Sequence, residues 1–314
     1  MLFPNKKQQK ILQLILTTGS LRSSALHDEM IKQGEDVSLV TVKRMLSEMA
    51  GQGVLVVTGS GRATSYTVST LGRAGADIDA GAYCSTEPDR RHGQGRYNFD
   101  LFSNFPAELF SEEELQHLER ATVLYRAKVK DLPSAIQKKE LERLMIELSW
   151  KSSKIEGNTY TLLDTEKLIL ENKKASGKTE AEARMILNHK EAFQFVRKNA
   201  GLFTTMTRKH LEALHAILVK DMHVGLGLRK KPVGVVGSLY RPLDNIHQIV
   251  EAVDALQAAV NRMTTPYSMA LAGLLGVSYI QPFEDGNKRT GRLLANALLL
   301  AHGCAPLSYR SVDE

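Results

Sequence analysis

The chain contains little cysteine and lacks any long apolar segment. Its 314 residues include two cysteines, Cys84 in a glycine-containing stretch and Cys304 near the expected end of a helix. Such isolated thiols exclude a disulfide framework and a cysteine-based zinc site. No apolar run approaches the roughly 20 residues that a membrane-spanning helix needs, and the N-terminus lacks the pattern of a signal peptide. We therefore expect a cytoplasmic protein that has no membrane partner.

The domain organisation follows from the length of the chain and from the distribution of glycine and charge. A chain of 314 residues is long enough for about two domains. Glycines and scattered charges mark residues 71–97, a composition that cannot build a core and that predicts a linker. Helix signals resume near Ser111, before three glutamates in a favourable first turn, and continue to about His302. We expect a mainly α domain over residues 98–314, preceded by a separate domain over residues 1–70.

The first 70 residues show the pattern of three amphipathic helices followed by two β-rich runs. The expected helices and strands cover residues 7–16, 23–31, 38–49, 54–57 and 65–68. Ser20 and Ser38 lie near plausible N-cap positions of the second and third helices. Three helices and a hairpin in this order resemble the winged helix-turn-helix domain.

The winged-helix resemblance implies a DNA-binding surface on the third helix and on the turn between the strands. The residues that would face DNA are Thr41, Lys43, Arg44, Ser47 and Arg62. Residues 1–75 contain nine Lys or Arg and five Asp or Glu, a small positive excess for a protein that must displace counterions from several phosphates. Winged helices also serve as protein-docking or dimerising modules. DNA binding and homodimer formation are therefore both open for this domain.

The most informative segment is residues 281–292, which read Gln-Pro-Phe-Glu-Asp-Gly-Asn-Lys-Arg-Thr-Gly-Arg. Apolar residues recur at helical spacing on both sides, so the segment is expected in a loop between two buried helices. Gly286 and Asn287 tolerate backbone angles that turn successive N–H groups toward one point, and the following helix adds its positive end. This chemistry suits a phosphate group.

The segment resembles the core motif of the Fic family, His-x-Phe-x-(Asp/Glu)-Gly-Asn-(Gly/Lys)-Arg-x-x-Arg, at eleven of its twelve positions. The resemblance implies a Fic-type helical bundle that transfers AMP from ATP to a protein hydroxyl, on an unknown target protein or on the chain itself. It also implies that Asp285 holds Mg²⁺. The residues that would bind phosphate oxygens are Gly286, Asn287, Lys288, Arg289 and Arg292.

Two positions of the core motif bear directly on the reaction. Where the family has its catalytic histidine, this chain has Gln281, whose amide has no titratable proton near neutral pH and cannot act as a general base. We therefore expect nucleotide binding with weak or absent transfer. Lys288 is a family variant that is also found in the Doc-type toxins, which transfer phosphate instead of AMP. Phosphate transfer therefore stays open as an alternative reaction.

A second motif lies about 125 residues before the core motif. The segment Ser152-Ser-Lys-Ile-Glu156-Gly157 ends a predicted helix over about residues 136–157. It resembles the inhibitory motif (Ser/Thr)-x-x-x-Glu-(Gly/Asn) of the same family, whose glutamate pairs with the second arginine of the core motif, here Arg292. A carboxylate that occupies this guanidinium prevents it from holding the γ-phosphate of ATP. Glu156 is thus expected to inhibit the site.

Residues 228–242 form a β-rich run punctuated by glycine inside an otherwise helical domain. The run resembles the flap hairpin of the Fic family, which could pair with an extended target segment through main-chain bonds. The residues expected to dock the target are Val233, Gly234, Val235, Val236 and Gly237. The alternative is a surface hairpin that closes one end of the helical bundle.

Several histidines lie on or near the expected helices of the second domain. We expect them at the surface or at helix caps, and not as general bases; they are His189, His210, His215, His223 and His247. The sequence ends at Glu314, soon after the last expected core helix, and whether a C-terminal segment follows stays open. The alternative function is that of a nucleotide-sensing DNA-binding transcriptional regulator, in which the pocket reports its ligand state to the winged helix.

Overall fold

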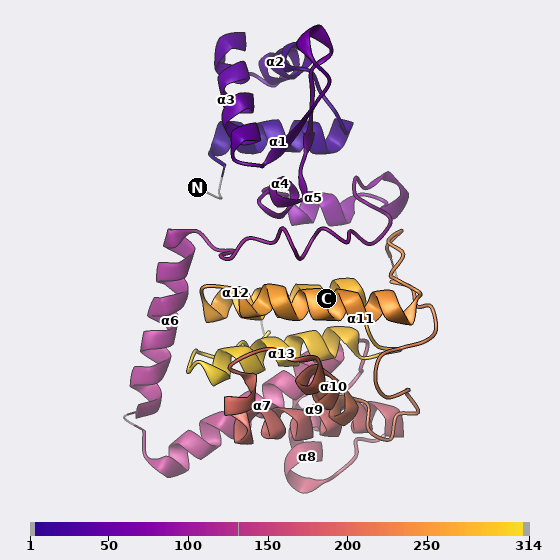
Figure 1. The fold of residues 1–314 in the computed structure, drawn as a ribbon. Coiled ribbons are helices and arrows are strands. Elements are labelled where there is room, and N and C mark those ends of the chain that lie inside the picture. The colour runs from indigo at the N-terminus through magenta and orange to yellow at the C-terminus, as the bar shows by residue number, and fades with distance from the viewer. Residues whose placement is uncertain (1–3, 131, 236, 310–314) are drawn as a thin grey trace. The chain divides into compact units, whose positions relative to one another are not determined.

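The protein is mainly α-helical, as the sequence predicts. The computed structural model describes residues 4–130, 132–235 and 237–309. Within these residues, helices account for nearly all regular structure and the sheet that forms has two strands (Figure 1). Contacts divide the chain into two compact units, one of residues 1–109 with 234–241 and the other of residues 110–233 with 242–314.

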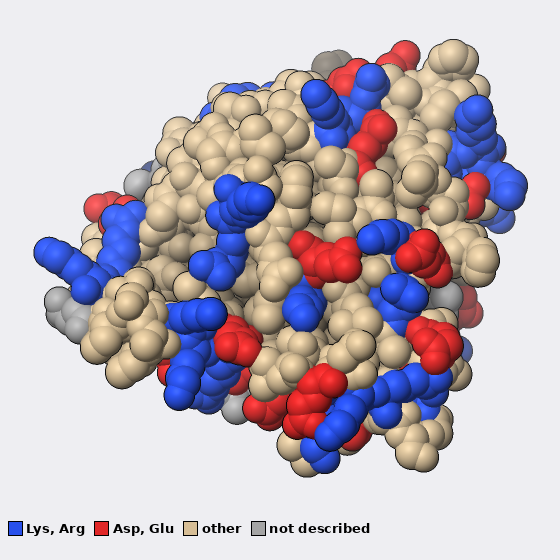
Figure 2. Space-filling view, turned by 90° about the horizontal axis from the view of Figure 1, so that it is seen from below, with Lys and Arg blue, Asp and Glu red and all other residues tan. Residues whose placement is uncertain are grey.

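The surface carries charges of both signs. On the face shown in Figure 2, Lys and Arg side chains are interspersed with Asp and Glu side chains and do not gather into one continuous patch. Across the ranges that the structure covers, no helix is both long and apolar enough to cross a lipid bilayer.

The N-terminal unit begins with the three helices and the hairpin that the sequence pattern predicts. The elements are α1 (Lys6–Thr18), α2 (Ser23–Lys32), α3 (Leu39–Gly51), β1 (Leu55–Thr58) and β2 (Ser65–Val68). The strands pair antiparallel with Leu55 opposite Val68. Ser38 caps α3 by accepting a hydrogen bond from the Thr41 N–H, whereas α2 starts after Arg22 without a side-chain cap, so the expected cap at Ser20 was wrong. One core unites these elements because the apolar faces of all three helices and the inner strand residues are buried together.

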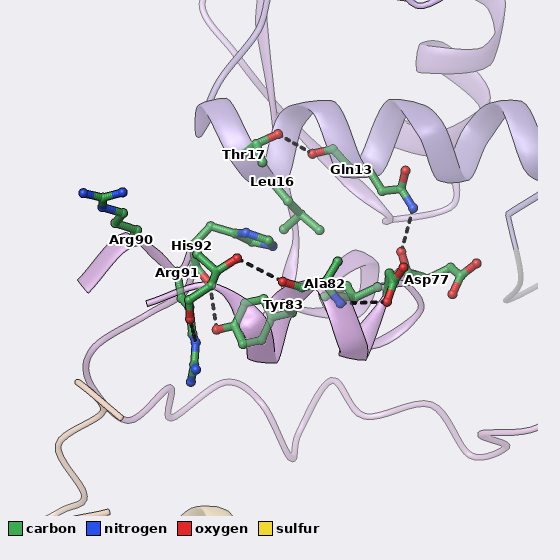
Figure 3. Close-up of a pocket in the computed structure, with 12 residues that line it drawn as sticks. Gln13, Leu16, Thr17, Asp77, Ala82, Tyr83, Arg90, Arg91 and His92 are labelled. Carbon is green, nitrogen blue, oxygen red and sulfur yellow. Dashed lines mark hydrogen bonds between the residues drawn. The ribbon is translucent and has the colours of Figure 1, made fainter. Parts of the chain in front are cut away.

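The glycine-containing stretch after the hairpin forms short helices, and the residues between the first two of them bond to α1. These are α4 (Thr70–Ala74), α5 (Ala80–Ser85) and the 3₁₀ turn η2 (Pro88–Arg90). The Gln13 amide donates a hydrogen bond to the Asp77 carbonyl at 2.9 Å, and the Tyr83 hydroxyl donates to the His92 carbonyl at 3.0 Å. Between α1 and these segments lies a cavity of about 430 Å³, which belongs to the N-terminal unit (Figure 3). Composition alone did not indicate this ordered packing.

The second unit is a bundle of helices around one central helix. Its elements are α6 (Glu112–Lys130), α7 (Ser134–Lys154), α8 (Leu162–Glu171), α9 (Glu180–Lys198), η3 (Ala200–Phe203), α10 (Arg208–Leu218), α11 (Ile246–Asn261), α12 (Pro266–Ile280) and α13 (Asn287–Ala301). Helix α13 contacts α7, α9, α10 and α12, and it is buried along nearly its whole length. Residues 281–286 therefore form a short loop between two core helices, as predicted.

Glycine allows α12 to approach both neighbouring helices closely (Figure 1). A Cβ atom on Gly291 of α13 would lie 2.9 Å from the Leu274 carbonyl oxygen of α12. A Cβ atom on Gly276 would lie 2.2 Å from a methyl group of Leu256 on α11. Both distances are below ordinary contact, so a side chain at Gly291 would push α13 away from the α12 backbone, and one at Gly276 would displace the Leu256 side chain. This close packing fixes the two ends of the loop at 281–286.

The flap hairpin predicted for residues 228–242 is not present as strands in the described part of this run. An isolated bridge joins Arg241 to Arg96, and the Ser238 N–H donates to the Val235 carbonyl at 3.2 Å in a turn. Pro232 lies within the run and Pro242 ends it. Both lack the N–H group that a ladder needs, which gives a physical reason for the absence of pairing. The β-branched residues predicted strands here, but the described residues of the run have no partner strand.

Candidate functional site

Helix α12 ends at Gln281 in a left-handed backbone conformation. Gln281 has φ 52° and ψ 59°, and its N–H donates to the Val277 carbonyl at 3.0 Å. This conformation is unusual for a residue other than glycine and costs about 1 kcal/mol or more, so the surrounding structure must impose it. The Gln281 amide donates back to the Ser278 carbonyl at 2.7 Å, and the residue is buried. Residue 281 is thus held at the mouth of the loop with its side chain against its own helix.

The middle of the loop is anchored by an aromatic stack and an amide bridge. The Phe283 ring is fully buried and stacks on the His215 ring of α10, with ring centroids 3.8 Å apart and planes 4° from parallel. The Asn287 side chain accepts from the Phe283 N–H and donates to the Phe283 carbonyl, both at 2.9 Å. The amide of Asn287 is therefore used within the loop. One of its two N–H donors is engaged in this way, and phosphate binding by Asn287 stays a prediction.

The start of α13 has the properties of an anion-binding site. Gly286 is the N-cap in a left-handed conformation, with φ 79°. The first N–H groups of a helix have no intrahelical acceptor, and the helix dipole adds partial positive charge there. The Gly286 carbonyl is occupied by the Thr290 N–H and hydroxyl, both at 2.8 Å. Donors with no acceptor inside the helix therefore gather at the first turn, with the exposed Lys288 beside them.

Arg289 and Asp285 form an ion pair across the first turn of α13. The Arg289 guanidinium donates to the Asp285 carboxylate at 3.0 Å. The arginine side chain is 2% exposed, whereas the aspartate side chain is 62% exposed. Burial lowers the pKa of the Arg289 guanidinium, and the Asp285 and Glu156 carboxylates act against that decrease. The pair places a buried cation under the loop and an accessible carboxylate at its rim.

The accessible carboxylate suits a metal that is shared with a bound phosphate. Asp285 directs one oxygen to Arg289 and keeps the rest of its carboxylate at the surface. Mg²⁺ is commonly held by one or two carboxylates together with substrate phosphates and water. Among the residues that the structure describes, no cluster of three or more His, Cys, Asp or Glu side chains forms a complete metal cage. The Asp285 carboxylate thus fits a metal that is held jointly with a phosphate ligand.

Arg292 is held by the end of α7, far away in the sequence. Its guanidinium donates to the Glu156 carboxylate at 2.7 Å, and it also donates to the Ser152 hydroxyl at 3.0 Å and the Ser152 carbonyl at 2.8 Å. The Arg292 side chain is 8% exposed and the Glu156 side chain 23% exposed. Gly157 follows with φ 87°, a left-handed conformation that lets the chain leave the helix. The structure therefore brings together both ends of the predicted ion pair.

Two histidines beside these arginines are buried, which corrects the expectation of surface or capping positions. His189 and His215 are almost fully buried on α9 and α10. Burial, aided by the positive charges of Arg292 and Arg289, lowers the pKa of His189 to about 3. Burial also lowers the pKa of His215 to about 4, although the Asp285 carbonyl 3.0 Å away acts in the other direction. Both rings are therefore neutral near pH 7. The apolar neighbours Leu211, Leu214 and Leu218 on the same helix face were a signal for the burial of His215.

Sequence reasoning also missed Arg229, which is fully buried beside the loop. Its Nε donates to the Gln281 carbonyl at 2.6 Å, and its backbone N–H donates to the Pro282 carbonyl at 2.9 Å. The same guanidinium donates to the carbonyls of Lys231 and Leu243. Arg229 thus ties the backbone of residue 281 to both ends of the 231–243 segment. No local pattern distinguishes such a structural arginine from a surface one.

The predicted docking run is divided between the two units. Val233 belongs to the second unit, whereas Gly234, Val235 and Gly237 group with the N-terminal unit, and Val236 lies outside the described residues. The Gly237 carbonyl accepts from Arg91 at 3.2 Å within the N-terminal unit. Docking of a target segment by this run stays a prediction.

The predicted DNA-facing residues lie mostly on one exposed face of α3. Lys43, Arg44 and Ser47 are exposed, and Arg62 is exposed in the turn between the strands. Arg44 lies 3.5 Å from Glu48, so part of its charge is balanced on the same helix. Thr41 is half-buried and its hydroxyl pairs with that of Ser38 at the helix start. The structure thus presents a small basic face on this helix.

Comparisons with known proteins identify relatives of this chain. Residues 205–299 match the Fic/DOC family. The chain is 28% identical over 183 residues to a protein named protein adenylyltransferase Fic from Nematostella vectensis. This alignment covers 56% of this chain and 42% of that protein. It is 28% identical over 156 residues to a protein of the same name from Drosophila willistoni, and that alignment covers 49% of this chain and 31% of the relative. The chain thus spans less than half the length of these curated relatives.

A solved structure supports the same fold. The crystal structure of a Fic domain containing signaling protein from Bacteroides thetaiotaomicron superposes with a TM-score of 0.52 at 21% identity, and covers 60% of this chain and 73% of that one. At this identity the likeness speaks for the helical fold alone.

Proposed function

We propose that this chain, which carries a Fic/DOC family domain at residues 205–299, is an inhibited protein adenylyltransferase that binds ATP. The observation that carries the proposal is the contact of Arg292 with Glu156 at 2.7 Å, beside a helix start equipped to bind an anion. A buried arginine under such a helix start is typical of phosphate recognition. The names of the relatives support adenylyl transfer as the reaction.

The triphosphate would lie along the first turn of α13. Backbone N–H groups after Gly286 would donate to phosphate oxygens, while Arg289 and Arg292 would neutralise their charge. Asp285 would hold Mg²⁺ together with those phosphates. When bound, the metal supplies positive charge that stabilises the phosphate chain during substitution.

The proposed reaction is substitution at the α-phosphorus of ATP. The oxygen of a protein hydroxyl forms a bond to that phosphorus, the bond to the bridging oxygen breaks, and pyrophosphate leaves. The hydroxyl proton must pass to a base at position 281. Gln281 cannot accept it, and loss of a general base typically lowers the rate by about 10² to 10⁴. The protein is therefore expected to bind ATP and to transfer AMP weakly or not at all.

Glu156 would provide a second and independent restraint on the reaction. Its carboxylate occupies the guanidinium of Arg292, which the γ-phosphate of ATP would otherwise contact. Because two anions cannot share that fork without repulsion, bound ATP must displace the carboxylate or adopt another pose. Removal of Glu156 should therefore tighten ATP binding even when residue 281 is glutamine.

Calorimetric titration with ATP and Mg²⁺ tests the binding part of this proposal. The Glu156→Gly variant should bind ATP about tenfold more tightly than the unaltered chain. Arg292→Lys in the Glu156→Gly background is the matched control, since it keeps the charge but loses the planar fork, and it should reverse most of the gain. No ATP binding by Glu156→Gly would refute the proposed site.

Labelled ATP tests the reaction. The variant with both Gln281→His and Glu156→Gly should incorporate α-label into itself or into lysate proteins, whereas the chain with Gln281 should not. Incorporation of γ-label without α-label would instead identify phosphate transfer, and Lys288→Gly would then be expected to change that outcome. If neither label reaches protein, the transferase assignment fails.

A second candidate function is DNA binding that responds to nucleotide. The exposed face of Lys43, Arg44 and Ser47 on α3 supports it, because these side chains can reach phosphates and base edges. This candidate predicts an operator affinity that changes when ATP is added. Measurement of binding to genomic DNA fragments with and without ATP separates it from the transferase assignment.

A further inference from the structure

The segment that follows Glu156 is tied to the start of α9 by one carboxylate. The Glu182 Oε1 atom accepts from the Thr159 N–H at 3.0 Å and from the Thr159 hydroxyl at 2.5 Å. The other oxygen accepts from the N–H and hydroxyl of Thr179, both at 2.9 Å, in the capping box of α9. These bonds lower the pKa of Glu182 to about 2, with the Thr159 hydroxyl as the largest cause. Glu182 thus bridges two segments, and only one of its two oxygens serves the helix cap.

Further bonds hold the same segment at both of its ends. The Asn158 amide donates to the Glu182 carbonyl at 2.9 Å, and the Lys178 ammonium donates to the Thr159 carbonyl at 2.7 Å. The Trp150 indole on α7 donates to the Tyr160 carbonyl at 3.0 Å. Residues 157–160 are therefore a strap that fastens the last turn of α7 to α9.

Arg292 and Glu156 differ in how firmly they are held. Arg292 belongs to the central helix α13, and two bonds to Ser152 keep its guanidinium in place. Glu156 lies after the last residue of α7, next to Gly157 in a left-handed conformation. Its side chain is partly exposed, and among the described residues its carboxylate forms an ion pair with Arg292, from which it accepts a hydrogen bond at 2.7 Å. The position of the Glu156 carboxylate therefore depends on the strap more than on its own helix.

We infer that Glu182 is a positioning residue for Glu156, and that its bond to Thr159 sets how strongly the inhibitory carboxylate competes with ATP for Arg292. This inference rests on the proposed function, because it assumes that Glu156 and ATP exclude one another. Without the bridge, the strap gains freedom about Gly157 and the carboxylate spends less time on the guanidinium. The freed strap gains conformational entropy, so the Glu156 carboxylate is less ordered, whereas Ser152 still orients the Arg292 guanidinium.

Two threonines of the same network provide matched variants. Thr159→Val keeps the branched shape but removes the hydroxyl that links the strap to Glu182, and it leaves the cap of α9 intact. Thr179→Val removes the hydroxyl that serves the cap and leaves the strap contact intact. Glu182→Gln weakens both contacts. ATP affinity is measured by calorimetry for each variant, alone and together with Glu156→Gly.

The inference predicts that Thr159→Val tightens ATP binding about threefold and Glu182→Gln about three- to tenfold. Thr179→Val should lower the melting temperature without tightening ATP binding. In the Glu156→Gly background, Thr159→Val and Glu182→Gln should no longer change the affinity, because the carboxylate they position is gone. Glu182→Gln also weakens the cap of α9, so Thr159→Val is the deciding variant if the glutamine variant does not fold.

Two failures are distinguishable. If Glu156→Gly tightens ATP binding but Thr159→Val does not, or if Thr159→Val has the same effect with and without Glu156, the positioning role is overturned while the inhibitory contact stands. If Glu156→Gly itself leaves ATP affinity unchanged, the inhibitory part of the proposed function is overturned, and the positioning role falls with it.

Discussion

Helices α3 and α13 both carry cationic side chains, but they hold them in opposite ways. On α3, Lys43 and Arg44 are exposed, and Arg44 meets Glu48 at 3.5 Å in solvent. On α13, Arg289 and Arg292 are buried and meet carboxylates at 3.0 Å and 2.7 Å. An exposed ion pair contributes little to stability because water and salt screen it, whereas a buried charge must keep its partners.

The comparison shows that burial decides what an arginine can do. A screened cation attracts any polyanion at long range, with little geometric selectivity. A buried and oriented guanidinium recognises one anion at one place, and it can be blocked by a single carboxylate. The basic residues of α3 therefore suit nucleic acid, whereas those of α13 suit a small phosphate ligand and its regulation.

The largest expected difference between the two helices concerns stability. Arg292→Ala should lower the free energy of unfolding by about 3 kcal/mol, because it leaves the Ser152 and Glu156 acceptors without their donor in a largely buried site. Arg44→Ala should change it by less than about 0.5 kcal/mol. Urea denaturation of both variants measures the contrast. Equal effects would show that the burial of Arg292 is not maintained in solution.

The second expected effect is a dependence of stability on pH that originates beside the buried arginines. The folded-state pKa of His189 is about 3, below its ordinary value of 6.5, so the folded protein binds this proton less readily than the unfolded chain. The contribution is present above pH 6.5 and is lost as the pH falls toward 3. Between pH 7 and pH 5 the loss should be about 2 kcal/mol.

Denaturant titrations at pH 7 and pH 5, on the unaltered chain and on His189→Gln, measure this contribution. The variant should lose less stability between the two pH values than the unaltered chain. An unchanged pH dependence in the variant would mean that His189 is not the buried neutral group described above.

The exposed face of α3 should give a third and smaller effect, on DNA affinity. The double variant Lys43→Ala with Arg44→Ala should bind duplex DNA more weakly, and the slope of log affinity against log salt should fall by about 2. Lys173→Ala with Lys174→Ala in the other unit is the matched control, since those exposed lysines also pair with glutamates. A control pair that weakens DNA binding equally would remove the special role of α3.

The smallest effect concerns the cap that positions the same face. Ser38→Ala removes the side-chain acceptor for the Thr41 N–H and should destabilise α3 by about 1 kcal/mol. Ser47→Ala, on the exposed middle of the helix, should have little effect. Amide hydrogen exchange of α3 compares the two variants, and faster exchange in both would contradict a local capping role.

Much of the fold could be predicted because the relevant signals are local. The helices of the N-terminal unit, its hairpin and the loop between α12 and α13 follow from apolar spacing, caps and glycine positions. The absence of strands in the described part of residues 228–242 could not be predicted in this way, since β propensity says nothing about a partner strand. Nor could the burial of His189, which depends on how α9 packs against its neighbours.

The candidate site shows the same division. The motif at 281–292 identified the loop, the two arginines and Asp285, and the pattern at 152–157 identified Glu156 as the acid to meet Arg292. The motif did not indicate that the Asn287 amide closes on Phe283, or that Arg229 binds the carbonyl of residue 281. These contacts use backbone groups whose positions are set only when the helices pack.

By itself, the sequence determined which chemical groups the site contains. They are a glycine at a helix start, two arginines one turn apart, one carboxylate beside them, and the Gln281 amide at the position of the family's general base. The tertiary structure decided which of these groups meet. Arg292 and Glu156 are separated by 136 residues, and no local spacing fixes a contact of that length. Only the close packing of α7, α9 and α13 brings the Glu156 carboxylate, the strap and the Arg292 guanidinium to one place. A buried charge needs a partner, and the packing of the helices decides which partner is within reach.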